Sequence, residues 1–159
     1  MKDEEVAVRA MQAGDVEAIL KIVREILGEY GFAPDMGGVR ADLAGAAERY
    51  AAPRGGIWVA TAAGVVVGSV GIRPKEGRTA ELKRLYLSPT LRGKGLGQRL
   101  YAHAETFARG AGYERVWLDS SRRFTAARRL YERNGFVRTA SLDNDWEDDV
   151  WEKSLLRPD

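Results

Sequence analysis

Residues 92–97, with the sequence Arg-Gly-Lys-Gly-Leu-Gly, carry the clearest chemical signal in the chain. Three glycines at alternate positions let the backbone approach a ligand with no side chain in the way. An apolar pattern with helical spacing follows at once, and the start of a helix offers unpaired N–H groups and a positive dipole end. Arg92 and Lys94 add positive charge beside them. The segment therefore predicts an anion pocket suited to phosphate groups.

Two common phosphate motifs do not fit this loop. A P-loop needs Gly-Lys followed by Ser or Thr, and the chain has no such triplet. A dinucleotide fingerprint needs Gly-x-Gly-x-x-Gly, but here Gln98 stands where the third glycine belongs. A third pattern, Arg/Gln-x-x-Gly-x-Gly/Ala, is matched in full by Arg92, Gly95 and Gly97.

Two further segments accompany the loop. Residues 81–87 (ELKRLYL) read as a strand that stops before Pro89, and residues 127–136 (ARRLYERNGF) fit the pattern A-x-x-L-Y-x-x-x-G-F. Together and in this order, the three segments resemble the GNAT acetyltransferase superfamily. The resemblance covers roughly residues 57–137, and the order of elements along the whole chain agrees with it.

This resemblance implies an acyl-CoA-dependent N-acyltransferase with acetyl-CoA as cosubstrate. The acetyl group would pass directly to a primary amine of a small molecule or peptide in a ternary complex. The pyrophosphate would bind the backbone N–H groups of Arg92, Gly93, Lys94, Gly95, Leu96 and Gly97. The pantetheine arm would pair with the backbone of Leu85, Tyr86 and Leu87, where a β-bulge would open a slot for the thioester. Since the chain has no cysteine, no cysteine-linked acyl-enzyme is expected.

Two residues are candidates for catalysis. The resemblance implies that Tyr131 protonates the leaving thiolate, although helical spacing alone would make it a core tyrosine. Glu81 is the candidate base, acting through water, and a plain charge at a strand edge is an equally good reading. Strict alternation along the strand would put Glu81 on the same face as Leu85 and Leu87, unless a bulge intervenes.

Several other residues have competing interpretations. Arg92 could contact phosphate or remain a solvated charge, and contact is favoured. We expect His103 to be a packing or surface residue. The acidic stretch of residues 143–149 could attract a cationic substrate, but an exposed turn is favoured. Trp58, Trp146 and Trp151 could line an acceptor pocket or pack in the core. Phe124 stands where many relatives carry an asparagine that contacts pantetheine, so that hydrogen bond is not expected.

The elements that would position these residues follow from hydrophobic spacing and turn residues. We predict helices near residues 16–30, 39–50, 96–111 and 125–134, and a flexible loop at residues 36–38. We predict strands near residues 6–11, 57–61, 65–73, 79–88, 115–120, 136–140 and 149–155. The fold class is α+β, with a mixed, mostly antiparallel sheet of about seven strands flanked by about four helices. Residues 79–120 should bring two strands parallel.

Composition limits the remaining possibilities. A chain of 159 residues fits one domain, residues 1–159. It has no apolar run long enough to span a bilayer and no secretory signal, so we expect a cytoplasmic protein with no membrane partner. Without cysteine there is no thiolate metal site, and no metal is expected. A net charge of +2 makes nucleic-acid binding a weak rival. A non-catalytic acyl-CoA-binding module is the alternative function, and a homodimer is possible.

Overall fold

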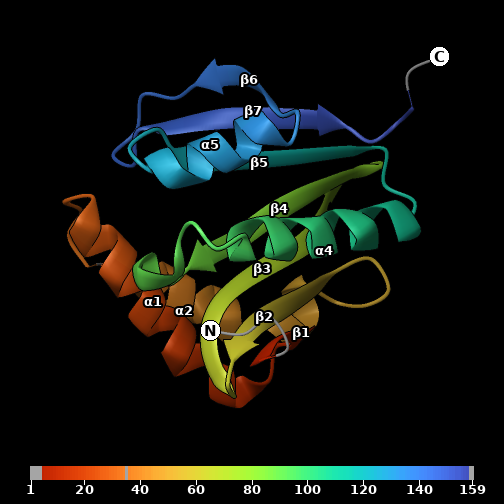
Figure 1. Cartoon of the computed structure of the whole chain (residues 1–159). Coiled ribbons are helices and arrows are strands. Elements are labelled where there is room, and N and C mark those ends of the chain that lie inside the picture. Colours follow the sequence, from red (N-terminus) through yellow and green to blue (C-terminus); the bar gives the residue numbers. More distant parts are fainter. Residues whose placement is uncertain (1–4, 35, 158–159) are drawn as a thin grey trace.

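A seven-stranded sheet, in the order β1-β2-β3-β4-β5-β7-β6, forms the centre of the fold (Figure 1). The computed structural model describes residues 5–34 and 36–157. The strands are β1 (Val6–Ala10), β2 (Gly56–Ala62), β3 (Val65–Glu76), β4 (Thr79–Leu87), β5 (Arg115–Ser121), β6 (Val137–Ser141) and β7 (Asp148–Ser154). The α-helices are α1 (Val16–Glu29), α2 (Gly37–Ala44), α3 (Ala46–Arg49), α4 (Leu96–Gly110) and α5 (Thr125–Arg133). In this part of the chain, no helix combines the length and hydropathy needed to cross a bilayer.

Strand pairing confirms the predicted α+β class with a mostly antiparallel sheet. Within the described residues, the parallel pair is β4 with β5, joined by α4 as expected for residues 79–120. Only residues 79–81 of β4 pair with β5, opposite residues 115–117. Beyond Glu81 the two strands diverge, which Figure 1 shows as a widening space between their ribbons. The backbone edge of residues 82–87 that faces β5 is therefore left outside the ladder.

Two apolar cores lie on opposite faces of the sheet. The helix α1 presents a buried stripe at helical spacing, which packs with Leu43 of α2 and with Ile57 and Val59 of β2. The other face is covered by α4 and α5, through residues such as Leu100 and Leu130. This arrangement leaves the divergence of β4 and β5 between the two helical layers.

A β-bulge interrupts β4 at Arg84. Ser69 pairs with Tyr86 while Gly71 pairs with Lys83, so β4 has one residue more than β3 across this step. Arg84 adopts a positive φ of 57°, which is uncommon for a residue other than glycine. The extra residue reverses the side-chain alternation beyond it.

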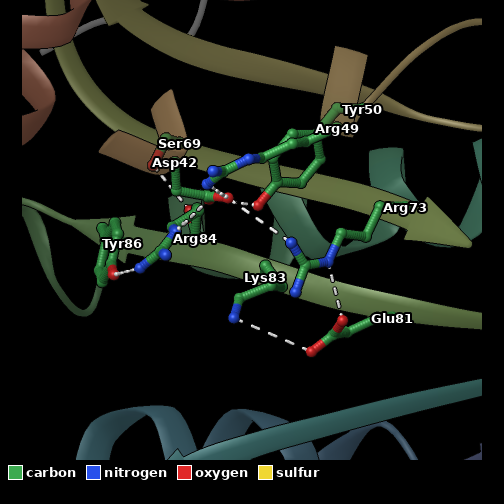
Figure 2. Close-up of polar contacts among 9 residues, drawn as sticks. All are labelled: Asp42, Arg49, Tyr50, Ser69, Arg73, Glu81, Lys83, Arg84 and Tyr86. Atoms are coloured by element: carbon green, nitrogen blue, oxygen red, sulfur yellow. Dashed lines mark hydrogen bonds and ion pairs between the residues drawn. The ribbon is translucent and has the colours of Figure 1, made fainter. Parts of the chain in front are cut away.

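The bulge corrects the expectation that Glu81 shares a face with Leu85 and Leu87. Leu85 and Leu87 pack on the α4 face, where Leu87 approaches Gly68 and Gly97. Glu81 instead contacts Arg73 on the α2 side of the sheet (Figure 2). Strict alternation failed because it assumes an unbroken ladder.

The helix predicted at residues 39–50 differs in the structure in where it begins and in its continuity. It begins at Gly37, so Gly37 and Gly38 are helical rather than part of a loop, and it is broken at Gly45 into α2 and α3. A glycine inside a helix is less favourable than alanine by about 1 kcal/mol, which makes this a natural break point. The short α3 adds a fifth helix to the four expected.

We predict that Gly68→Ala destabilises the fold by about 2 kcal/mol, because there is no room for a methyl group between β3 and β4. A Cβ at Gly68 would lie 2.8 Å from the carbonyl oxygen of Tyr86 and 2.8 Å from Leu100. Gly28→Ala, on the exposed face of α1, meets nothing within 4 Å and should stabilise by about 0.5–1 kcal/mol. Urea unfolding followed by circular dichroism measures both, and equal stability of the two variants would contradict the prediction.

Candidate active site

A cavity of about 730 Å³ occupies the region where β4 and β5 diverge. Its walls come from β4, the start of α4, β5 and α5, and from α1 and α2 on the opposite side. Its volume lies in the range of small-molecule and cofactor pockets. Because both helical layers contribute, two ligands can approach its centre from opposite faces of the sheet.

The start of α4 forms the anion-binding end of this cavity. Gly95 is the N-cap residue and has no side chain to cap the helix, so the first N–H groups of α4 are left for other partners. Gly93 and Gly95 have φ values of 82° and 80°, a backbone region that glycine enters without strain. Gly93, Gly95, Leu96 and Gly97 all line the cavity. The loop can therefore offer converging N–H groups to an anion.

The two charged side chains of the loop behave differently from each other. Arg92 lines the cavity, and its guanidinium forms an ion pair with Glu29 at the end of α1, close to the ring of Tyr30. This pair links the glycine loop to the opposite helical layer. Lys94 is exposed and is not among the lining residues. A direct phosphate contact by either side chain stays a prediction.

The residues expected to pair with pantetheine, Leu85, Tyr86 and Leu87, all line the cavity. They follow the bulge, on the part of β4 that has left the ladder with β5. Their N–H and C=O groups on that edge face the cavity instead of a neighbouring strand. An extended ligand can pair with such an edge as an added strand would.

Tyr131 lies on α5 at the floor of the cavity and is only 4% exposed. Its ring packs against Phe136 and Trp151, with centroids 5.7 and 6.4 Å away. Burial raises the pKa of its phenol above the ordinary value, while a hydrogen bond from Ser120 acts in the opposite direction. The phenol therefore stays protonated through the neutral range. It is suited to donate a proton or a hydrogen bond.

Glu81 does not line the cavity. Its carboxylate accepts a hydrogen bond of 2.8 Å from Nε of Arg73 and lies 3.9 Å from Nζ of Lys83 (Figure 2). A carboxylate held in this way serves first to neutralise its cationic neighbours. The role of Glu81 as the base stays a prediction, and its position favours a structural role.

Four charged residues line the cavity from the strands and were not singled out as site residues by sequence reasoning. Lys83 and Arg84 line it from β4, Asp119 from β5 and Asp148 from β7. Burial raises the pKa of Asp148, a hydrogen bond from Asn144 lowers it, and the charge of Asp119 raises it further, so that it lies above the ordinary range. The two acidic residues are far in sequence from Lys83 and Arg84, and only the sheet order brings them to the same cavity.

The remaining candidates divide between cavity and core. His103 packs on Trp58 at 5.0 Å on the outer side of α4, as the packing interpretation predicts, and burial lowers its pKa. Phe124 and Trp146 line the cavity, whereas Trp58 and Trp151 do not. The acidic stretch forms the turn between β6 and β7, yet Trp146 and Asp148 from it reach the cavity.

Comparison with known proteins identifies the family of this chain. The model of the acetyltransferase (GNAT) family matches residues 20–136, most of the chain. The chain belongs to the acetyltransferase (GNAT) family. This membership confirms the predicted enzyme class, an acyl-CoA-dependent acetyltransferase, and its predicted cosubstrate, acetyl-CoA.

A curated relative supports the same family, and two solved structures share the fold. The chain is 35% identical to the N-acetyltransferase YjgM of Escherichia coli strain K12 over 133 residues, which are 80% of each protein. Its fold matches a GNAT acetyltransferase of Staphylococcus aureus Mu50 with a TM-score of 0.85 and 17% identity, over 95% of this chain and 99% of that one. It matches YncA of Salmonella typhimurium, solved with acetyl-CoA, with a TM-score of 0.76 and 23% identity, over 97% and 96%.

We predict that Gly95→Asp weakens coenzyme A binding at least tenfold more than Gly95→Asn does. Asp and Asn both tolerate the left-handed backbone and both cap helices well, so fold stability should be similar in the two variants. Only Asp adds a negative charge beside the expected pyrophosphate, and two like charges a few ångströms apart repel by about 1–4 kcal/mol near a surface. Isothermal calorimetry with coenzyme A measures the difference. Equal affinities would show that this loop does not hold the phosphates.

Proposed function

We propose that this acetyltransferase moves an acetyl group from acetyl-CoA directly to a primary amine, with both substrates bound together in the cavity. The observation that carries the proposal is the meeting of three features in one cavity. An uncapped glycine loop begins α4, the edge of β4 is left unpaired after the bulge, and the buried Tyr131 phenol lies close to both. Each matches one part of an acyl-CoA thioester.

Each part of the cosubstrate has a complementary surface. The pyrophosphate would accept hydrogen bonds from the N–H groups of residues 92–97, strengthened by the dipole of α4. The pantetheine arm would pair with the edge of Leu85, Tyr86 and Leu87. The thioester carbonyl would then lie near the backbone N–H of Leu87, which would stabilise the oxyanion that forms during attack.

Tyr131 would act on the leaving sulfur. A thiol has an ordinary pKa of about 8.5, well below that of a buried phenol, so complete proton transfer from Tyr131 is unfavourable. The phenol would instead donate a hydrogen bond to the thiolate as the C–S bond breaks. This hydrogen bond becomes stronger as negative charge develops on the sulfur. It therefore stabilises the transition state more than the bound substrates, which lowers the barrier.

The acceptor amine must also lose a proton, because an ammonium has no lone pair for attack. Asp148 is the better-placed proton acceptor: it lines the cavity beside Asp119, whereas Glu81 is held by Arg73 outside it. Its raised pKa makes it a stronger base than an ordinary carboxylate. We therefore assign the proton to Asp148, with Glu81 as the rival that sequence reasoning favoured.

We predict that Tyr131→Phe lowers kcat about a hundredfold and changes the affinity for coenzyme A less than threefold. The phenylalanine ring keeps the packing against Phe136 and Trp151 and removes only the hydroxyl. Tyr113→Phe is the matched control, since its hydroxyl donates to the carbonyl of Arg54 outside the cavity. Thiol release from acetyl-CoA with a panel of amines measures kcat. A wild-type chain that binds coenzyme A but acetylates no amine would favour the non-catalytic binding module instead.

We predict that Asp148→Asn lowers kcat/KM about a hundredfold, whereas Glu81→Gln leaves it within about threefold. Glu81→Gln should instead lower the free energy of unfolding, because Arg73 loses a charged partner. Kinetics and urea unfolding of both variants separate the two roles. The opposite pattern, with activity lost in Glu81→Gln and kept in Asp148→Asn, would return the base to Glu81.

A further inference from the structure

A network of charged side chains lies between α2, α3 and the strands β3 and β4 (Figure 2). It contains four cations and two carboxylates, joined by ion pairs: Arg49, Arg73, Lys83, Arg84, Asp42 and Glu81. Four positive charges against two negative ones leave an excess of positive charge. Such an excess at the wall of a cavity attracts an anionic group of a ligand.

The carboxylates of this network are already occupied on the side away from the cavity. Asp42 is buried and accepts hydrogen bonds from Tyr50 and from Arg49, and Arg73 lies 3.5 Å from it. Burial acts to raise the pKa of Asp42, but hydrogen bonds from Tyr50 and Arg84 outweigh it, so its pKa lies below the ordinary range. The carboxylate is therefore ionised, and together with Glu81 it offsets two of the four positive charges of the network.

The excess positive charge faces the cavity. Lys83 and Arg84 line it, whereas Arg49 and Arg73 do not. Nε of Arg84 donates to Asp42 at 2.8 Å and its Nη1 donates to the hydroxyl of Tyr86 at 3.1 Å, which fixes the plane of the guanidinium. A guanidinium has five N–H donors, so these two bonds leave capacity for a ligand carboxylate.

The backbone at Arg84 supports the same conclusion. Its φ of 57° is strained for a residue with a side chain, and such strain gathers at ligand sites. The bulge turns this side chain toward Asp42 and the cavity instead of leaving it on a regular strand. The position of the guanidinium is therefore built by the fold and does not depend on a flexible surface arginine.

The opposite wall of the cavity has the opposite charge. Asp119 and Asp148 line it from β5 and β7. The cavity is also lined by apolar side chains from α1, from α2 and from the segments that precede α5 and β7: Val23, Leu27, Val39, Phe124 and Trp146. One ligand with an amine, a carboxylate and an apolar body would satisfy all three surfaces.

We propose that the acceptor is a free amino acid with an apolar side chain, whose carboxylate binds Arg84 and Lys83 while its α-amine lies at Asp119 and Asp148. The assignment rests on the proposed function, since it needs the amine to face the thioester between β4 and β5. A simple cationic amine would bring no anionic group to offset the excess positive charge of the network. A long peptide presenting its N-terminus has an amide where the free carboxylate should be.

The test compares acceptors that differ only in the carboxylate. Each of L-leucine, L-methionine and L-phenylalanine is paired with its decarboxylated amine: 3-methylbutylamine, 3-(methylthio)propylamine and 2-phenylethylamine. For the wild type we expect kcat/KM to be at least tenfold higher for one or more of the amino acids than for its amine. Arg84→Gln should reduce this ratio about tenfold. Because each variant sees the same two acceptors, the difference between their amine pKa values cancels.

Arg49→Gln is the matched control. It makes the same chemical change at a second partner of Asp42, but Arg49 is half exposed and does not line the cavity, so the ratio should stay as in the wild type. Calorimetry with coenzyme A on all three proteins should give the same affinity. A loss of that affinity in Arg84→Gln would assign Arg84 to the cosubstrate and overturn the inference.

The remaining outcomes separate the inference from the proposed function. Three results would show that the acceptor class is wrong while leaving the coenzyme A site intact. The amines could be acetylated with the same kcat/KM as the amino acids, or Arg84→Gln could leave the ratio unchanged. In the third case, coenzyme A binds but none of these amino acids is acetylated. If the wild type does not bind coenzyme A at all, the proposed function fails and the acceptor assignment fails with it.

Discussion

The separation of β4 from β5 is the constraint on which the site depends. Two parallel strands normally remain paired, because unpaired backbone groups cost free energy when they are buried. Here pairing stops after Glu81, and the bulge at Arg84 bends β4 before it reaches the glycine loop. The edge left over needs a hydrogen-bonding partner, and an extended ligand with amide groups supplies one. The cavity is thus a part of the sheet that the chain itself leaves incomplete.

The two helical layers give this opening two different ends. On one side, α4 begins without a side-chain cap, so its N–H groups and dipole favour phosphate. On the other, α1 and α2 present apolar side chains above a charged network. The ion pair of Arg92 with Glu29 joins the glycine loop directly to the end of α1. Separate entrances of this kind let two substrates meet without competing for the same surface.

Much of the fold follows from local rules that the sequence displays. The turn at Ala63-Gly64 has positive φ at both residues, and Gly31 and Gly135 follow the ends of α1 and α5 in the same conformation. These positions are readable because only a few residue types accept such a backbone. The glycine loop belongs to the same class, since its function depends on backbone alone.

The charged part of the site could not be found in this way. Residues 81–87 fit a regular strand, and nothing in their order shows that Arg84 is an extra residue, because a bulge is defined by the partner strand. Asp42 and Arg84 are 42 positions apart, and Asp119 and Asp148 come from strands that are neighbours only through the sheet order. Contacts of this kind depend on tertiary structure. Motif reasoning therefore placed the catalytic base at Glu81, in the strand that the sequence motif identifies.

Positive φ angles at the two ends of the cavity show how each end works. At residues 93 and 95 the chain uses glycine, which relieves strain and removes any side chain between the ligand and the backbone N–H groups. At residue 84 it uses arginine, although left-handed backbone costs a residue with a Cβ about 1–2 kcal/mol. A glycine there would make the same bulge without that cost. The strain is therefore evidence that the side chain is needed, and its guanidinium lies where a substrate carboxylate would bind.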